Sequence, residues 1–141
     1  MYISDERAFE LIAKYGSPLY VYDEAILRKS CRDMYDFLPG KKMRVNFSAK
    51  ANSNPELLKI VMDEDIDVDA MSPGEIFIQK YAGYPAERIF YIGNNVSKDE
   101  MMYAIKDNVL VSVDSLSQLE SFGQINTGGK VAIRFNPGVG T

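Results

Sequence analysis

The sequence predicts an α/β fold that forms part of a (β/α)8 barrel, with about five parallel strands and their helices. Short apolar segments are each followed by a helix-start signal, and no hairpin turn joins neighbouring segments. The segments recur about every 20 to 25 residues, which is typical of successive βα units. No G-x-G-x-x-G motif follows the first of them, so a barrel is favoured over a dinucleotide-binding doubly wound sheet.

The expected strands are followed by turn residues and then by apolar residues at helical spacing. They cover residues 43–48, 66–70, 88–92, 109–113 and 130–135. Three of the helices begin with a predicted capping box, in which a serine and an acid or amide three residues later bind each other's backbone N–H groups. These pairs are Ser72 with Glu75, Ser97 with Glu100, and Ser115 with Gln118.

A helix, a strand and a second helix precede this array. We expect the first helix over residues 5–15, a short strand over residues 18–22, and the second helix from Asp23 onward. The apolar residues of the second helix that we expect to face inward are Ile26, Met34 and Phe37. The short strand lies upstream of the regular array and need not belong to the same sheet.

The composition limits the chemistry that the chain can perform. Its 141 residues carry a net charge of −4, which argues against nucleic acid or an anionic membrane as a partner. The chain has no histidine, which excludes Ser-His and Cys-His pairs and His-ligated zinc from it. Cys31 is the only cysteine and is predicted to be a packed thiol. An acidic amino terminus and the lack of an apolar run of about 18 residues predict a cytoplasmic protein.

The candidate site residues lie where the predicted strands end, because barrel active sites form at the carboxyl ends of the strands. These positions hold Lys50, Asp69, Asn94, Asp114 and Arg134. Asn94 and Asp114 are ordinary turn formers and helix caps. Lys50 and Arg134 are neither, and they interrupt apolar strands near the expected barrel axis. An amine there, with its pKa lowered by burial or by a neighbouring cation, is suited to attack an aldehyde.

A six-residue segment resembles the Tyr-Ala-x-Lys-Ala-Asn motif of the fold-type III pyridoxal-phosphate decarboxylases, and it reads Phe47-Ser48-Ala49-Lys50-Ala51-Asn52. Further similar segments follow in family order along nearly the whole chain, at residues 17–23, 52–55, 68–75, 85–89, 113–115 and 134–139. Within this family, the residues at 72–75 and 134–138 are most similar to those of the diaminopimelate decarboxylases. Phe47 and Ser48 stand where tyrosine and alanine are commoner.

The resemblance implies an alanine racemase-like barrel and a pyridoxal 5′-phosphate cofactor that is bound to Lys50 as an internal aldimine. It also implies that Ser48, Asp69 and Arg134 line the cofactor. Glu75 matches a family position too, but its predicted capping box with Ser72 is enough to explain this residue. The implied reaction is the decarboxylation of meso-2,6-diaminopimelate to L-lysine and CO2 in lysine biosynthesis, by a homodimer. Carboxynorspermidine, ornithine and arginine stay open as substrates. A non-catalytic half-barrel module that pairs with another chain is the alternative from a different class.

A complete barrel takes about 250 residues, which exceeds the length of this chain. We therefore expect the N-terminal part of a larger enzyme, in which residues 1–23 join a C-terminal β domain and residues 24–141 begin the cofactor-binding barrel. The phosphate-binding loop and the histidine that stacks on the cofactor ring in this family would lie beyond Thr141. The chain alone is expected to be inactive, and exposed strand edges would favour oligomers.

Overall fold

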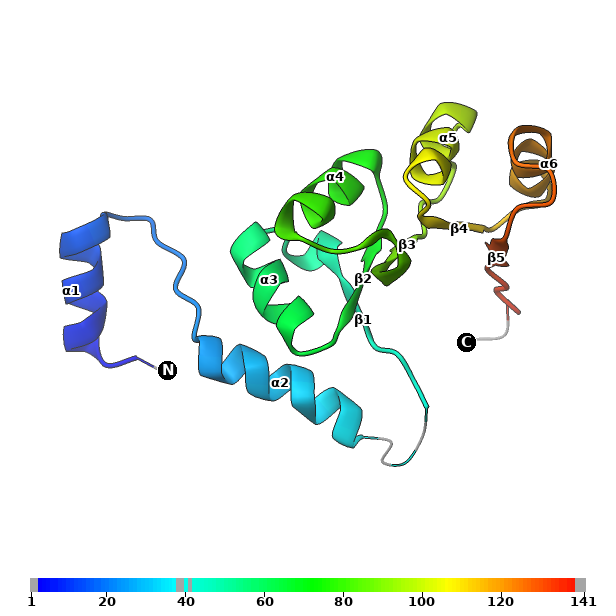
Figure 1. The fold of residues 1–141 in the computed structure, drawn as a ribbon. Coiled ribbons are helices and arrows are strands. Elements are labelled where there is room, and N and C mark those ends of the chain that lie inside the picture. Colours follow the sequence, from blue (N-terminus) through cyan, green and yellow to red (C-terminus); the bar gives the residue numbers. More distant parts are fainter. Residues whose placement is uncertain (1–2, 38–39, 41, 139–141) are drawn as a thin grey trace.

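A computed structural model describes residues 3–37, 40 and 42–138, which form one parallel sheet with helices along one side (Figure 1). The elements in chain order are α1 (Asp5–Tyr15), α2 (Glu24–Asp36), β1 (Asn46–Ser48), η1 (Ala49–Ala51), α3 (Pro55–Asp63), β2 (Asp67–Ala70), α4 (Pro73–Ala82), η2 (Ala86–Arg88), β3 (Ile89–Tyr91), α5 (Lys98–Lys106), β4 (Leu110–Val113), α6 (Leu116–Ile125) and β5 (Val131–Ile133). The strand order is β1-β2-β3-β4-β5, and every neighbouring pair is parallel. The predicted α/β architecture is confirmed, with each expected strand present but shorter.

The two faces of the sheet have different surroundings, because successive side chains of a strand point to opposite faces. One face packs against α3–α6, which lie together along that side of the sheet in Figure 1. Its core joins strand residues such as Val68 and Tyr91 to helix residues such as Leu58, Ile76 and Met101. Alternation with Val68 and Ala70 places Ser48 and Asp69 on the other face, which carries the candidate site.

Serine residues begin α4, α5 and α6, as the sequence predicts, but only one of the three capping boxes has the expected form. Ser97 and Glu100 bind each other's backbone N–H groups. In α4, Glu75 instead accepts from the N–H of Met71, one residue before the N-cap, at 2.8 Å. In α6, the side-chain oxygen of Gln118 likewise accepts from the N–H of Asp114, the residue before its N-cap, at 3.0 Å. These two helices are therefore fastened to the ends of the preceding strands, because their side chains reach past the cap.

The predicted helix over residues 5–15 is confirmed as α1. Residues 18–22 form no strand within the described chain, and their pairing in a second domain stays a prediction. A strand needs a neighbour to complete its hydrogen bonds, and the described sheet consists of β1 to β5 alone. Residues 18–22 are instead extended chain that joins α1 to α2, and α1 stands apart from the sheet in Figure 1. No residue of α1 is buried.

Helix α2 begins after Asp23 as predicted, but it packs through a different face. Ile26, Met34 and Phe37, which were expected to point inward, are half exposed or more. The residues that pack against Val61 and Ile66 are Leu27, Cys31 and Tyr35, which recur at intervals of four. Cys31 is thus the packed thiol that the sequence predicts, and burial raises its pKa. Among the described helices, none combines the length and the apolar character that a bilayer crossing requires.

Candidate functional site

Lys50 lies in the short helical turn η1, which follows β1 directly. The turn carries the lysine past the end of the strand, and Lys50 is exposed, so burial, one of the two surroundings considered from the sequence, is not observed. Within the described residues, no hydrogen bond or ion pair engages this amine. Lys50 is therefore a free primary amine at the carboxyl edge of the sheet, where the barrel fold collects its reactive groups.

Asp69 lies beside this turn, because β1 and β2 pair in register and Ser48 stands opposite Asp69. Ser48 Oγ donates a hydrogen bond of 2.8 Å to Asp69 Oδ2. Asp69 is only 8% exposed, and its second oxygen, Oδ1, has no hydrogen-bond partner within the described part of the chain. A buried carboxylate oxygen without a donor costs free energy, so this atom is suited to accept a bond from a bound group.

Gln79 is a site-supporting residue that the sequence analysis did not single out. Its side chain is fully buried in α4, and its Nε2 donates to the backbone carbonyl of Asp69 at 2.7 Å. The available signal was an amide on the apolar face of α4, one turn after Ile76, because a buried amide requires a partner. Glu75 also differs from expectation, since its carboxylate holds the Met71 N–H rather than completing a capping box with Ser72.

Arg134 follows β5 and therefore lies, like Lys50 after β1, at the carboxyl end of a strand. Its Nη1 donates to Asn94 Oδ1, after β3, at 3.4 Å. These two residues line a polar cavity of about 420 Å³ together with Asp114, Phe135 and Asn136. The structure thus brings Arg134 together with Asn94 and Asp114, while Lys50, Ser48 and Asp69 form a second group at the ends of β1 and β2.

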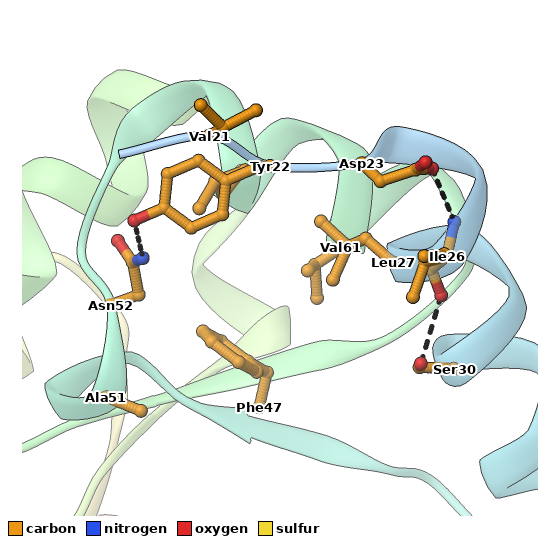
Figure 2. A pocket seen from close by; sticks show the side chains of 11 residues that line it. Val21, Tyr22, Asp23, Ile26, Leu27, Ser30, Phe47, Ala51, Asn52 and Val61 are labelled. Carbon is orange, nitrogen blue, oxygen red and sulfur yellow. Dashed lines mark hydrogen bonds between the residues drawn. The ribbon is translucent and has the colours of Figure 1, made fainter. Parts of the chain in front are cut away.

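A separate apolar cavity of about 380 Å³ lies on the helix side of β1, between α2 and α3 (Figure 2). Tyr22 and Phe47 line it, and Lys50 does not. At its rim, Asn52 Nδ2 donates to Tyr22 Oη at 2.9 Å, and Asn52 Oδ1 accepts from the N–H of Asn54 at 3.0 Å. Asn52 therefore connects the chain before α2 to the turn that carries Lys50.

The chemistry of the site is that of an amine, a carboxylate and a guanidinium. Residues 3–37, 40 and 42–138 contain no cluster of histidine, cysteine or acidic side chains that could hold a metal ion. A free lysine amine can attack an aldehyde, a buried carboxylate can balance a positive nitrogen, and a guanidinium can bind an anionic group. The donor set fits an organic cofactor that carries an aldehyde and anionic groups.

Comparison with known proteins identifies such a family. Residues 24–141 match the family model "Pyridoxal-dependent decarboxylase, pyridoxal binding domain". The chain is 40% identical over 141 residues to the diaminopimelate decarboxylase of Methanothermobacter thermautotrophicus, covering 98% of this chain and 33% of the relative. It is 33% identical over 139 residues to the Bacillus subtilis enzyme of the same name, covering 94% and 32%. The chain thus spans about one third of the length of these relatives.

Solved structures show the same fold. Diaminopimelate decarboxylase from Helicobacter pylori, complexed with L-lysine, superposes with a TM-score of 0.78 at 29% identity, over 89% of this chain and 33% of that one. Lysine decarboxylase from Selenomonas ruminantium gives a TM-score of 0.88 at 21% identity, over 99% and 38%, and supports the fold alone. The α/β fold is thus that of the first part of the decarboxylase barrel, and the chain belongs to the family of pyridoxal-dependent decarboxylases.

Proposed function

We propose that this chain is the N-terminal part of a decarboxylase that converts meso-2,6-diaminopimelate to L-lysine and CO2, with pyridoxal phosphate attached to Lys50. The observation that carries the proposal is the unpaired Lys50 in η1, a turn that contacts β2, where the carboxylate of Asp69 is buried and half-satisfied. The activity belongs to the full-length protein, for which we also propose a cytoplasmic location and a homodimeric state. Residues 1–23 would join its second domain.

Each residue of the site has a distinct role in this proposal. When bound, pyridoxal phosphate supplies an electron sink for the electron pair that the departing CO2 leaves behind. Lys50 would hold the cofactor covalently through its amine. Asp69 balances positive charge through Oδ1 while Ser48 holds Oδ2. Arg134, in its polar cavity with Asp114, binds an anionic group of the bound molecules.

Diaminopimelate is favoured as substrate by the degree of similarity to the named relatives. Sequence identity reaches 40% with a diaminopimelate decarboxylase. The sequence identity to a lysine/ornithine decarboxylase from Vibrio vulnificus is 19%, which supports the fold alone. Release of CO2 from the full-length enzyme should be compared for diaminopimelate, ornithine, arginine and carboxynorspermidine. We expect turnover of diaminopimelate. Turnover of one of the others alone would replace this substrate while leaving the lysine assignment intact.

The lysine assignment is tested by the colour of the full-length protein. We expect yellow absorbance from the bound cofactor, its loss in Lys50→Ala, and its retention in Lys106→Ala, which changes an exposed lysine of α5. Borohydride reduction followed by peptide mapping should place the adduct on the peptide that contains Lys50. An adduct on another lysine, or colour that survives in Lys50→Ala, would show that the assignment is wrong.

A further inference from the structure

We infer that Gln79 and Ser48 are positioning residues that fix Asp69 from two sides, so that its free oxygen Oδ1 stays directed at the bound cofactor and its lysine. The inference rests on the proposed function and adds Gln79 to Ser48 as a second residue that acts through Asp69. It is carried by three observations: the hydrogen bond from each residue to Asp69 and the unpaired Oδ1.

The backbone of Asp69 is held from the helix side of the sheet. Gln79 reaches from α4 and donates to the Asp69 carbonyl at 2.7 Å. The bond falls at the last register pair between β1 and β2, where Ser48 faces Asp69 and β1 gives way to η1. The ladder with β1 stops here, whereas β2 stays paired with β3 through Ala70, so the bond from Gln79 holds Asp69 on the side that β1 leaves. Gln79 fixes the backbone at this end of the ladder.

The side chain of Asp69 is held from the neighbouring strand. Ser48 Oγ donates to Oδ2 at 2.8 Å, which fixes the rotation of the carboxylate. With its backbone and one oxygen both held, Asp69 cannot turn Oδ1 toward a donor elsewhere. The buried oxygen therefore stays available to the molecule that binds beside Lys50.

Only one end of the Gln79 amide forms a hydrogen bond within the described residues. Its Oε1 is buried and has no hydrogen-bond partner within the described residues. A methionine of similar shape would lose the bond to Asp69 but would also remove this unsatisfied oxygen, so the two effects on stability oppose each other. Gln79→Met is thus a variant in which a site effect separates from a folding effect.

The experiment uses the full-length enzyme with four variants: Gln79→Met, Ser48→Ala, Ser48→Thr and, as a matched control on the exposed face of α6, Gln124→Met. We expect Gln79→Met and Ser48→Ala to lower kcat about tenfold or more, with a smaller change in KM. The Kd of pyridoxal phosphate for the apoenzyme should rise, and the pH midpoint of the bound cofactor's absorbance should move. Ser48→Thr, which keeps the hydroxyl, should recover most of the lost affinity.

Action through Asp69 is tested by combining changes. In an Asp69→Ala background, Gln79→Met and Ser48→Ala should cause no further loss of kcat or affinity, because the group that they position is gone. Equal additional losses in that background would overturn the inference. It would also be overturned if Gln79→Met only lowered the Tm and kept kcat, Kd and the absorbance midpoint of the wild type. A wild-type enzyme that binds no pyridoxal phosphate would instead refute the proposed function.

Discussion

Asp67 and Asp69 stand two positions apart on β2, and their surroundings give them opposite roles. Asp67, near the amino end of the strand, accepts from Arg44 and, at 2.8 Å, from Arg88 Nε. Asp69, near the carboxyl end, keeps one oxygen without a donor in the described chain. The amino end of a barrel strand serves stability and the carboxyl end serves chemistry, and this pair of residues follows that division.

The ion pairs of Asp67 predict a pH-dependent stability. Burial alone would raise the pKa of the Asp67 carboxyl, but the hydrogen bonds from Arg44 and Arg88 outweigh burial and lower it. Because the folded-state pKa lies below that of the unfolded chain, the stabilisation is fully present above the ordinary aspartate pKa. It is lost as the pH falls through the lowered value.

We therefore expect Asp67→Asn to lower the free energy of unfolding of the full-length protein by about 1–3 kcal/mol at neutral pH. The difference from the wild type should shrink as the pH falls below the ordinary aspartate pKa and through the lowered one. Urea unfolding at a series of pH values measures this, with Asp99→Asn on the surface of α5 as the control. A difference that stays constant down to acidic pH would contradict the role of the ion pairs.

At the scale of elements, Tyr22 anchors the extended segment between α1 and α2. Its hydroxyl accepts from Asn52 at 2.9 Å, beside the apolar cavity of Figure 2. In Tyr22→Phe the ring still fills the cavity while the bond, worth about 0.5–1.5 kcal/mol, is lost. We expect faster proteolytic cleavage between α1 and α2, by about threefold to tenfold. Limited proteolysis should show no such change for Tyr20→Phe, since Tyr20 is 86% exposed. Equal cleavage of both variants would contradict the anchor.

The elements differ in how far sequence patterns could predict them. The five strands and α3–α6 were predictable because apolar residues recur along each strand segment and each helix begins after a capping side chain. The strand over residues 18–22 stays a prediction, because its pairing depends on a neighbour that local sequence does not specify. The inward face of α2 was mispredicted because two apolar stripes run along it, and only contact with Val61 and Ile66 selects the stripe of Leu27 and Cys31.

In the site, too, some features follow from nearby sequence and others only from packing between elements. Motif and strand-end position single out Lys50, Asp69 and Arg134 as candidates, and the structure adds that Ser48 lies against Asp69. The contribution of Gln79 could not be predicted, because α4 must first fold back over β2 before its amide reaches the Asp69 carbonyl. A residue that acts by bonding to the backbone of another element is not marked by a motif in the nearby sequence.

For the molecule as a whole, the described sheet has two edges, since β1 and β5 each pair with one strand only. Unpaired strand edges promote association. The isolated 141-residue chain should therefore form oligomers whose proportion rises with concentration, as measured by sedimentation at two concentrations. Ile133→Lys, which adds a charge at the exposed end of β5, should reduce this association. A concentration-independent monomer of the unaltered chain would contradict the prediction.

The order of the strands has a consequence for folding during synthesis on the ribosome. Each strand pairs with the one synthesised just before it, so every new βα unit finds its docking surface already made. Contacts between near neighbours in the sequence form fast and require little chain to be gathered from afar. The domain can therefore fold one βα unit at a time as it leaves the ribosome. β1 and the following turn with Lys50 can then be folded before the last strands have been translated.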